Sequence, residues 1–283
     1  ASSLAYALGY LGGGLLFAVN VVMVLMPERF GFANQGDAVQ AAFLMVALWW
    51  ALFTVPLALI VPESRGTGRR TLRAAVRGAF AELAGTLRQI RRLPNTFLFL
   101  IAYWFYIDGV DTIIFMAVKY GLDLGFASDS LMVALLITQF VGFPAALVFG
   151  RLGARWGPKP SILLAIGVYA VVVLAASQMT RVEHFYLLAA SIGLVQGGIQ
   201  ALSRALFASL IPAGQTAEMF GFYNMIGKFA AVLGPFLVGS TAALAGDPRV
   251  SLLPILGLFL IGALLLWHVD VQAGRADAAR HIP

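Results

Sequence analysis

The sequence contains no cysteine, only three histidines and few charged residues, which make up 11% of its 283 positions. Without cysteine there is no disulfide framework, no thiolate nucleophile and no cysteine-ligated zinc or iron–sulfur site. The histidines lie far apart, at His184, His268 and His281, so neither a metal site nor a cofactor is expected. Soluble domains carry about 25% charged residues. The low charge therefore argues against a soluble enzyme, a nucleic-acid binder or a disordered scaffold.

Hydrophobic residues are abundant instead, at 60% of the chain, with a mean hydropathy of +0.88. A membrane-spanning helix needs about 20 mostly apolar residues. Eight windows meet this length: 4–26, 41–61, 96–118, 130–149, 161–179, 185–206, 218–243 and 251–269. Because lipid cannot satisfy exposed backbone N–H and C=O groups, such runs must be helical. The sequence predicts an all-α polytopic membrane protein surrounded by a lipid bilayer.

Basic residues gather on one side of these predicted spans. The loop 62–95 holds eight arginines, the turn 150–160 holds three basic residues, and Arg275 and Arg280 lie in the tail. The loops on the other side hold one basic residue each. Cytoplasmic loops carry an excess of Lys and Arg. We therefore expect the long loop and the C-terminus to be cytoplasmic, and the net charge of +6 to reflect topology rather than nucleic-acid binding.

Within the long loop, residues 71–93 carry apolar side chains at helical spacing, with arginines on the other face, and Pro94 follows. This pattern predicts an amphipathic helix ending before Pro94. A basic helix of this kind lies on the anionic inner leaflet of a membrane. A solvated connector between two helical bundles is the alternative interpretation.

A glycine-rich stretch recurs six spans apart, at 9–14 (GYLGGG) and at 234–239 (GPFLVG). Such repetition suggests two related six-helix halves. The predicted division is then 1–61 for the last two helices of one half, 62–95 for the linker, 96–270 for a complete six-helix half and 271–283 for a cytoplasmic tail. Pro56, Pro144 and Pro235 fall inside spans and are expected to kink them.

The turn at 150–159 (GRLGARWGPK) resembles the cytoplasmic loop signature of the major facilitator superfamily. The matching residues are Gly150, Arg155, Gly157 and Lys159. The sequence departs from the signature at Ala154, where the family has Asp, and at Pro158. In physical terms the glycines allow a tight turn, while the basic residues stay on the cytoplasmic side and can cap helix C-termini.

Three further segments are similar to the "unknown major facilitator" transporters, which include the autophagy-related vacuolar amino-acid effluxers of fungi. They are 105–114 (FYIDGVDTII), 196–204 (QGGIQALSR), which is followed by Ile211-Pro212, and 220–223 (FGFY). This resemblance implies the twelve-span major facilitator fold and export of amino acids. Since eight spans are visible, it also implies that the first four helices of the same chain lie outside this sequence and are partners of the visible ones.

Asp108 and Asp111 lie midway along the third span, at positions i and i+3 of one helix face. A charged residue at mid-span costs about 2.5–3.5 kcal/mol, which makes it a candidate functional residue. Two carboxylates this close in a medium of low dielectric resist double ionisation, so one can hold a proton. They are our candidates for proton coupling. Hydrogen bonds to neighbouring helices or to a buried cation are the alternative.

Candidate substrate-binding residues lie in the sixth and seventh spans: Gln196, Gln200, Asn224 and Lys228. The two glutamines share one helix face, and the glycines at 197–198 leave room beside them for a ligand or a kink. Lys228 is a candidate partner of the aspartates, and an Asp–Lys pair offers sites for both charges of a zwitterion. Alternatively, Lys228 extends toward the cytoplasmic end of its span. Arg204 lies near that end and is interpreted as an anchor there.

The expected function is therefore secondary active efflux of a small solute, with amino acids as substrates and H⁺ as the coupling ion. A non-transporting membrane partner or receptor derived from a truncated transporter is the alternative. A membrane-embedded enzyme is not expected, because both aspartates share one helix and no His-Glu-x-x-His zinc site is present. The short loops favour a multi-pass protein of the bacterial inner (cell) membrane.

Overall fold

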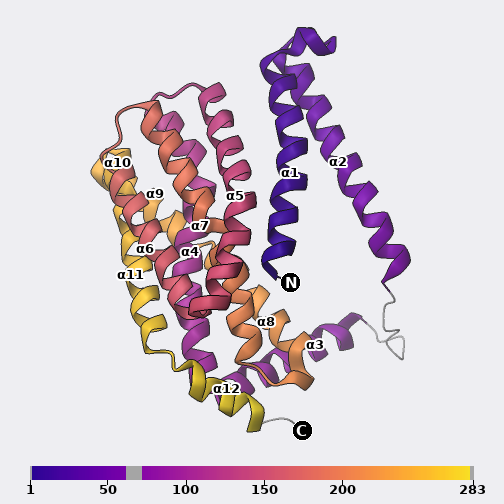
Figure 1. The fold of residues 1–283 in the computed structure, drawn as a ribbon, viewed down its shortest axis with the longest axis vertical. Coiled ribbons are helices and arrows are strands. Elements are labelled where there is room, and N and C mark those ends of the chain that lie inside the picture. Colours follow the sequence, from indigo (N-terminus) through magenta and orange to yellow (C-terminus); the bar gives the residue numbers. More distant parts are fainter. Residues whose placement is uncertain (1, 62–71, 281–283) are drawn as a thin grey trace. The chain divides into compact units, whose positions relative to one another are not determined.

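The computed structural model describes residues 2–61 and 72–280, and every regular element within those ranges is a helix. Eight helical segments there are long and apolar enough to cross a membrane, which confirms the eight predicted spans (Figure 1). The first six are α1 (Ser2–Leu25), α2 (Gln35–Ile60), α4 (Pro94–Asp123), α5 (Ser128–Trp156), α6 (Pro158–Ala176) and α7 (Val182–Ser209). The last two are divided, as α8 (Thr216–Ala230) with α9 (Leu233–Ala245), and α10 (Pro248–Ser251) with α11 (Leu253–His268).

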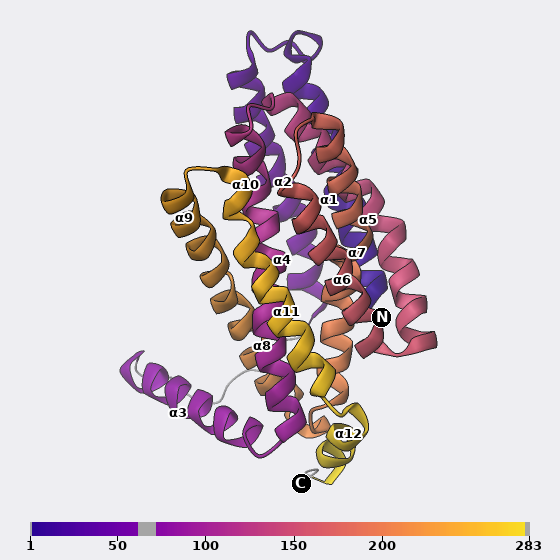
Figure 2. The same cartoon turned by 90° about the vertical axis from the view of Figure 1, so that its left-hand side faces the viewer.

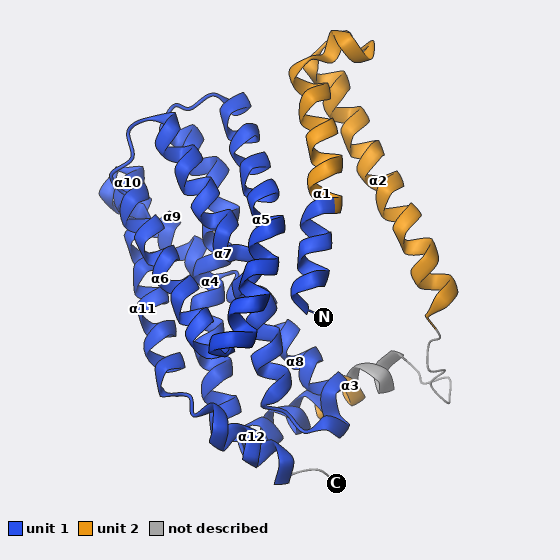
Figure 3. Ribbon diagram, in the orientation of Figure 1, with its two compact units in different colours: residues 1–11, 82–283 blue, residues 12–81 orange. Residues whose placement is uncertain are grey.

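Contacts divide the chain into two compact units, coloured separately in Figure 3. The larger unit comprises residues 1–11 and 82–283, and the smaller unit comprises residues 12–81. The first turns of α1 therefore belong with the larger unit and the rest of α1 with the smaller one. The predicted division into two bundles and a linker stays a prediction.

The larger unit is built around α4, which packs against α11, α8 and α9. Beside it, α5 packs along α7, and α6 contacts both α7 and α11 (Figure 2). The largest fully buried side chains are aromatic and come from several of these helices: Phe99, Tyr106, Tyr169, Phe207, Tyr223 and Phe259. Tyr106 and Ser203 join α4 to α7 through a hydrogen bond of 2.7 Å between their hydroxyl groups. This core fixes the helices that carry the candidate site residues.

The α5–α7 contact depends on glycine. A Cβ atom at Gly193 would lie 2.8 Å from the Thr138 backbone oxygen, and one at Gly198 would lie 2.2 Å from the Phe149 ring. Small residues allow helices to approach closely in a membrane, where no hydrophobic force between helices drives association. The glycines of α7 therefore determine how close α5 can lie.

The seventh span is broken between Ala230 and Leu233, so α8 and α9 are separate helical segments (Figure 2). Pro235 lies in the first turn of α9, where its missing N–H costs little because the first turn lacks intrahelical acceptors. The predicted kink at Pro235 is thus an interruption of the helix. By contrast, α2 and α5 continue through Pro56 and Pro144.

The amphipathic helix of the long loop is α3 (Leu72–Ile90), slightly shorter than predicted. Pro94 begins α4 rather than ending α3, which is the position where a fixed proline φ suits a helix start. Leu83, Leu87 and Ile90 pack against the core of the larger unit. Phe80 is 69% exposed. The arginines at 65, 69 and 70 lie outside the described residues.

The C-terminal segment, predicted only as a tail, forms the helix α12 (Val271–Arg280). Asp270 caps it, since its Oδ1 accepts hydrogen bonds from the backbone N–H groups of Gln272 and Ala273, both at 2.9 Å. The Asp270 N–H in turn donates to Asn95 Oδ1 at 2.9 Å. These bonds hold the start of α12 beside the start of α4.

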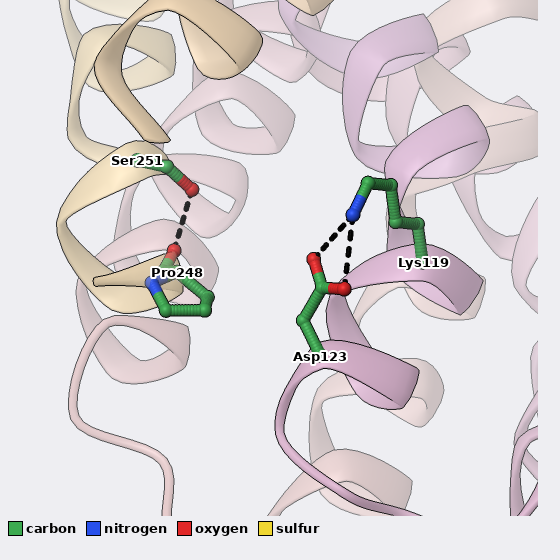
Figure 4. Close-up of polar contacts among 4 residues, drawn as sticks. All are labelled: Lys119, Asp123, Pro248 and Ser251. Carbon is green, nitrogen blue, oxygen red and sulfur yellow. Dashed lines mark hydrogen bonds and ion pairs between the residues drawn. The ribbon is translucent and has the colours of Figure 1, made fainter. Parts of the chain in front are cut away.

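At the other end of α4, Lys119 forms an ion pair with Asp123, with a closest Nζ–Oδ2 distance of 2.6 Å (Figure 4). Nearby along the chain, Gly125 has a φ of +82°, which lets the backbone turn toward α5. Figure 4 also shows the Ser251 hydroxyl donating to the Pro248 carbonyl within α10. Lys119, the single basic residue of the 119–129 loop, is thus engaged within its own helix.

The smaller unit contains most of α1, a 3₁₀ helix η1 (Pro27–Phe30) and α2. Asn34 caps α2 by accepting a hydrogen bond from the Asp37 N–H at 3.0 Å. Large apolar side chains of α2 are exposed, among them Phe43, Trp50 and Leu59. Apolar surface of this extent is expected of a helix that contacts lipid or further helices.

Candidate functional site

Asp108 of α4 is 1% exposed and contacts the start of α9. Its Oδ1 accepts a hydrogen bond of 3.0 Å from the Gly234 backbone N–H. A Cβ atom at position 234 would lie 1.8 Å from Thr112 Oγ1 and 3.0 Å from Asp108 Oδ1, so glycine is required there. The N-terminus of a helix carries unpaired N–H groups and partial positive charge, which favour a carboxylate. Asp108 therefore bonds a neighbouring helix, as the alternative interpretation of this residue expected.

The second oxygen of Asp108 has a different environment. Oδ2 is buried and no hydrogen bond of good geometry reaches it from the described residues, although the Thr112 hydroxyl, one turn further along α4, lies beside the carboxyl group. A buried acceptor without a partner is energetically unfavourable. A protonated carboxyl group would supply a donor at this point. The geometry thus suits a group that exchanges a proton while its other oxygen stays bound to α9.

Asp111 is only half-buried, and the charges of Asp108 and Lys228 both act on it. Lys228 lies exposed in the last turn of α8, where a cation is favourable next to the helix C-terminus. In the described parts of the chain no carboxylate lies within ion-pair distance of Lys228. The structure therefore brings Lys228 near Asp111 without forming the direct pair that the sequence suggested.

A cavity of about 870 Å³ lies within the larger unit, bounded by the first turns of α1 and by α5, α7 and α8. Its polar lining comes from Ser2, Tyr6, Tyr10, Gln139, Gln200 and Arg204. Of the predicted substrate-binding residues, Gln200 alone lines it. Binding sites for small molecules have this size and combine apolar walls with a few polar groups.

Arg204 faces this cavity. Its guanidinium lies 5.1 Å from the centre of the Phe220 ring, and Nη1 donates to Asn224 Oδ1 at 3.3 Å. The Phe220 ring is held edge-on against Phe207, with ring centres 5.2 Å apart. These contacts join Arg204 to α8, and its expected role as an anchor near the cytoplasmic end stays a prediction. Asn224, a predicted substrate ligand, is a hydrogen-bond partner of this arginine.

Gln196 and the neighbouring glycines contribute to helix packing. Gln196 Oε1 is buried without a described hydrogen-bond partner and does not line the cavity. A Cβ atom at Gly197 would lie 2.6 Å from the Tyr10 ring, and the space beside Gly198 is filled by Phe149. The room expected at 197–198 is thus occupied by two aromatic rings.

The cytoplasmic loop signature lies at the junction of α5 and α6, where Gly150 and Arg155 belong to the last turns of α5, Gly157 separates the two helices and Lys159 lies in the first turn of α6, so the turn is shorter than predicted. Gly157 adopts a φ of +91°, and a Cβ atom at Gly150 would lie 2.8 Å from the Ser3 side chain of α1. Lys159 Nζ donates to the carbonyls of Trp267 (2.7 Å) and Val269 (2.8 Å), at the C-terminus of α11. This is the capping geometry expected for a basic residue of this turn. Arg155 is exposed.

Comparison with known proteins shows which family the chain belongs to. The family model described as "Vacuole effluxer Atg22 like" matches residues 1–279. The chain belongs to this family. Among relatives, it is 38% identical over 272 residues to "Uncharacterized MFS-type transporter YxiO" of Bacillus subtilis, covering 96% of this chain and 63% of that protein. It is also 28% identical over 297 residues to "Autophagy-related protein 22" of Cryptococcus neoformans, covering 98% of this chain and 51% of that protein.

Membership of the Atg22-like family confirms the resemblance that the sequence segments carried. It agrees with the multi-pass helical architecture of the described residues. The chain spans between about half and two thirds of the length of these relatives.

Five polar residues that line the cavity of this Atg22-like chain were not predicted as site residues: Ser2, Tyr6, Tyr10, Gln139 and Arg204. The signal for Arg204 was present, because an arginine inside a span is a candidate functional residue by itself. Tyr6 and Tyr10, four residues apart, share one face of α1, yet tyrosines are common in packing and at membrane interfaces. Gln139 carries no sequence signal that separates it from a polar packing residue.

Proposed function

We propose that the protein is a secondary transporter that exports a small solute by alternating access, with amino acids as substrates and protons as the coupling ion. The observation that carries this proposal is the buried Asp108 carboxyl. One oxygen is bound to the N-terminus of α9, and no hydrogen bond of good geometry reaches the other from the described residues. An ionisable group inside a span, next to a discontinuous helix, is typical of transporter ion sites.

Proton coupling follows from how protonation changes the contact between α4 and α9. Ionised Asp108 places a negative charge at the positive end of α9, and this attraction holds the two segments together. Protonation removes that charge and weakens the attraction. Asp111, which senses the charges of both Asp108 and Lys228, is the second member of the proposed coupling pair. The break between α8 and α9 is the point where the span can bend.

The cavity supports the substrate part of the proposal. It is bounded by four helices of the larger unit, and Gln200 supplies both a donor and an acceptor to it. In another conformation of the carrier, we propose that the substrate contacts Gln196, Asn224 and Lys228. We propose efflux as the direction of transport because of the family description. We propose amino acids as substrates because the sequence segments resemble those of vacuolar amino-acid effluxers.

We also propose the bacterial cell membrane as the location, with the C-terminus cytoplasmic. The uneven distribution of arginine supports this orientation. The relative from Bacillus subtilis, identical at 38% of aligned positions, supports a bacterial origin of this type of chain.

The direct test is transport by the full-length protein reconstituted in proteoliposomes. A mixed pool of labelled amino acids is offered with an imposed pH gradient, without one, and with the gradient collapsed by a protonophore. We expect accumulation only while the gradient persists. Equal uptake in all three conditions would refute proton coupling. No uptake by protein shown to be folded would refute amino acids as substrates and would favour the non-transporting alternative.

A further inference from the structure

The cavity in the larger unit carries charge of one sign. Arg204 is its single charged lining residue within the described chain, and no carboxylate lines it. The remaining polar groups are the neutral side chains of Gln139, Gln200, Tyr6 and Tyr10 together with Ser2. A ligand that enters this cavity therefore meets one cationic side chain and neutral hydrogen-bonding groups on its wall.

Among the described residues, Arg204 has no acidic partner. No ion pair involves it in the described part of the chain, and its one hydrogen bond there goes to a neutral amide, Asn224. Charged side chains within membrane spans are normally paired or face a water-filled cavity, because an isolated charge is costly. Most of the guanidinium N–H groups of Arg204 thus remain available to a ligand.

The position of the guanidinium is nevertheless fixed. It lies on the face of Phe220, and that ring is packed against Phe207 and Tyr223, with ring centres 5.2 and 5.8 Å away. The hydrogen bond to Asn224 sets its direction along α8. A cation fixed in this way loses little side-chain freedom on binding a ligand, which favours affinity.

Around this cation the cavity offers donors and an apolar wall. Gln200 precedes Arg204 by one turn of α7, so both side chains lie on the same face of the helix. Tyr6 of α1 is close enough to feel the charge of Arg204 and, more weakly, that of Asp111, which does not line the cavity. Ala205, Ala208 and the Phe220 ring supply apolar surface next to them. Such a site matches an anionic group attached to an apolar body.

We propose that Arg204 is the carboxylate-binding residue of this cavity. The site then selects solutes that carry a carboxylate next to an apolar group and rejects the corresponding amines. A guanidinium binds a carboxylate through two parallel N–H···O bonds, which a lysine ammonium cannot reproduce. This inference rests on the proposed function, since it names the chemical group that the transported solute must carry.

The test uses three probes that share one apolar body: L-phenylalanine, 3-phenylpropanoate, which lacks the amine, and 2-phenylethylamine, which lacks the carboxylate. Binding to the full-length protein is measured as thermal stabilisation in detergent, and each probe also competes for amino-acid uptake into proteoliposomes. We expect L-phenylalanine and 3-phenylpropanoate to stabilise and compete, and 2-phenylethylamine to do neither. Stabilisation by the amine equal to that by the acid would overturn the proposal, as would the absence of binding by all three.

Variants of Arg204 provide the second arm. Arg204→Gln is expected to weaken 3-phenylpropanoate binding by about 10- to 100-fold, the loss expected for a hydrogen bond to a charged group. Arg204→Lys keeps the charge and is expected to fold and to bind about tenfold more weakly than wild type. The matched control is Arg181→Gln, which removes the same charge from the exposed N-cap of the same helix. Wild-type binding by Arg204→Lys, or by a folded Arg204→Gln, would overturn the proposal.

Two further results separate the possible failures. Inorganic phosphate tests whether any anion suffices, and stabilisation as strong as that by 3-phenylpropanoate would overturn a carboxylate-specific site. If gradient-driven amino-acid uptake holds while amine and acid compete equally, the carboxylate inference fails and the proposed function stands. If Arg204-dependent acid binding holds without gradient-driven uptake, the proposed function fails and the binding site stands.

Discussion

Asp108 and Gly234 are 126 positions apart in the sequence, and the backbone N–H of Gly234 donates to Asp108 Oδ1 at 3.0 Å. This bond connects the middle of one span to the break in another. It gives the buried carboxyl a structural role at the helix break, and it places the proposed proton-binding group at the point where the seventh span can bend.

The first prediction concerns the requirement for glycine at this contact. Gly234→Ala would bring a methyl group 1.8 Å from Thr112 Oγ1 and force α4 and α9 apart. Overpacking of this kind costs about 1–3 kcal/mol. We expect a lower melting temperature of the purified protein and reduced transport.

The matched control for that substitution is Gly239→Ala in the same helix, where an added Cβ meets nothing within 4 Å. It should leave the melting temperature unchanged or raise it slightly, because alanine is the better helix former. Adding Thr112→Ala to Gly234→Ala should restore part of the lost stability, since the closest clashing atom is removed. A Gly234→Ala protein as stable as the control would contradict the close contact.

The second prediction separates the charge of Asp108 from its hydrogen bond. Asp108→Asn keeps an oxygen that accepts from Gly234 but cannot take up and release a proton. We expect a folded protein that loses uptake driven by a pH gradient while still exchanging labelled for unlabelled substrate. The control is Asp123→Asn, which alters an exposed ion pair at the end of the same helix. Full gradient-driven uptake by Asp108→Asn would exclude Asp108 from coupling.

The third prediction concerns the cap on α11. Lys159→Met removes the ammonium that bonds the carbonyls of Trp267 and Val269. Loss of these contacts is expected to lower the free energy of unfolding by about 1–2 kcal/mol, seen as a lower melting temperature. Arg155→Met, from the same turn, changes an exposed side chain and serves as the control. Equal effects of the two substitutions would mean that charge in this turn, rather than the cap, is what matters.

The fourth prediction concerns orientation. Because these 283 residues contain no cysteine, single introduced cysteines can report which side of the membrane a position faces. Ala276→Cys in α12 and Thr180→Cys between α6 and α7 are both exposed positions. In intact cells a membrane-impermeant maleimide should label position 180 and spare position 276. The reverse pattern would show that the arginine-rich loops lie outside.

The membrane spans could be predicted from the sequence, whereas most contacts of the candidate site could not. The eight spans depend on runs of apolar residues, and such a run determines its own helix because the bilayer allows no other backbone arrangement. The aspartates of the third span stood out for a similar local reason, since a charge at mid-span is costly wherever the rest of the protein lies. The family segments likewise lie within single helices, and the family match agrees with them.

The contacts of the site could not be predicted in the same way. The sequence suggested Lys228 as a partner of the aspartates, whereas Asp108 accepts a hydrogen bond from a backbone N–H group. A bond to the backbone cannot be predicted from a pattern of side chains. It gave Arg204 the role of an anchor near the end of its span and gave no sign of the contacts to Phe220 and Asn224 that hold it at a cavity. It left open space at Gly197, which a ring from α1 fills.

The sequence alone therefore determined the membrane-spanning segments, their number among the described residues, and which residues are ionisable or polar within them, because hydrophobicity and charge act locally in a membrane. The tertiary structure decided which groups meet. Where a helix breaks, which oxygen lacks a hydrogen bond of good geometry and which cation faces a cavity all depend on packing between segments far apart in the chain. Those distances are fixed only when the helices come together.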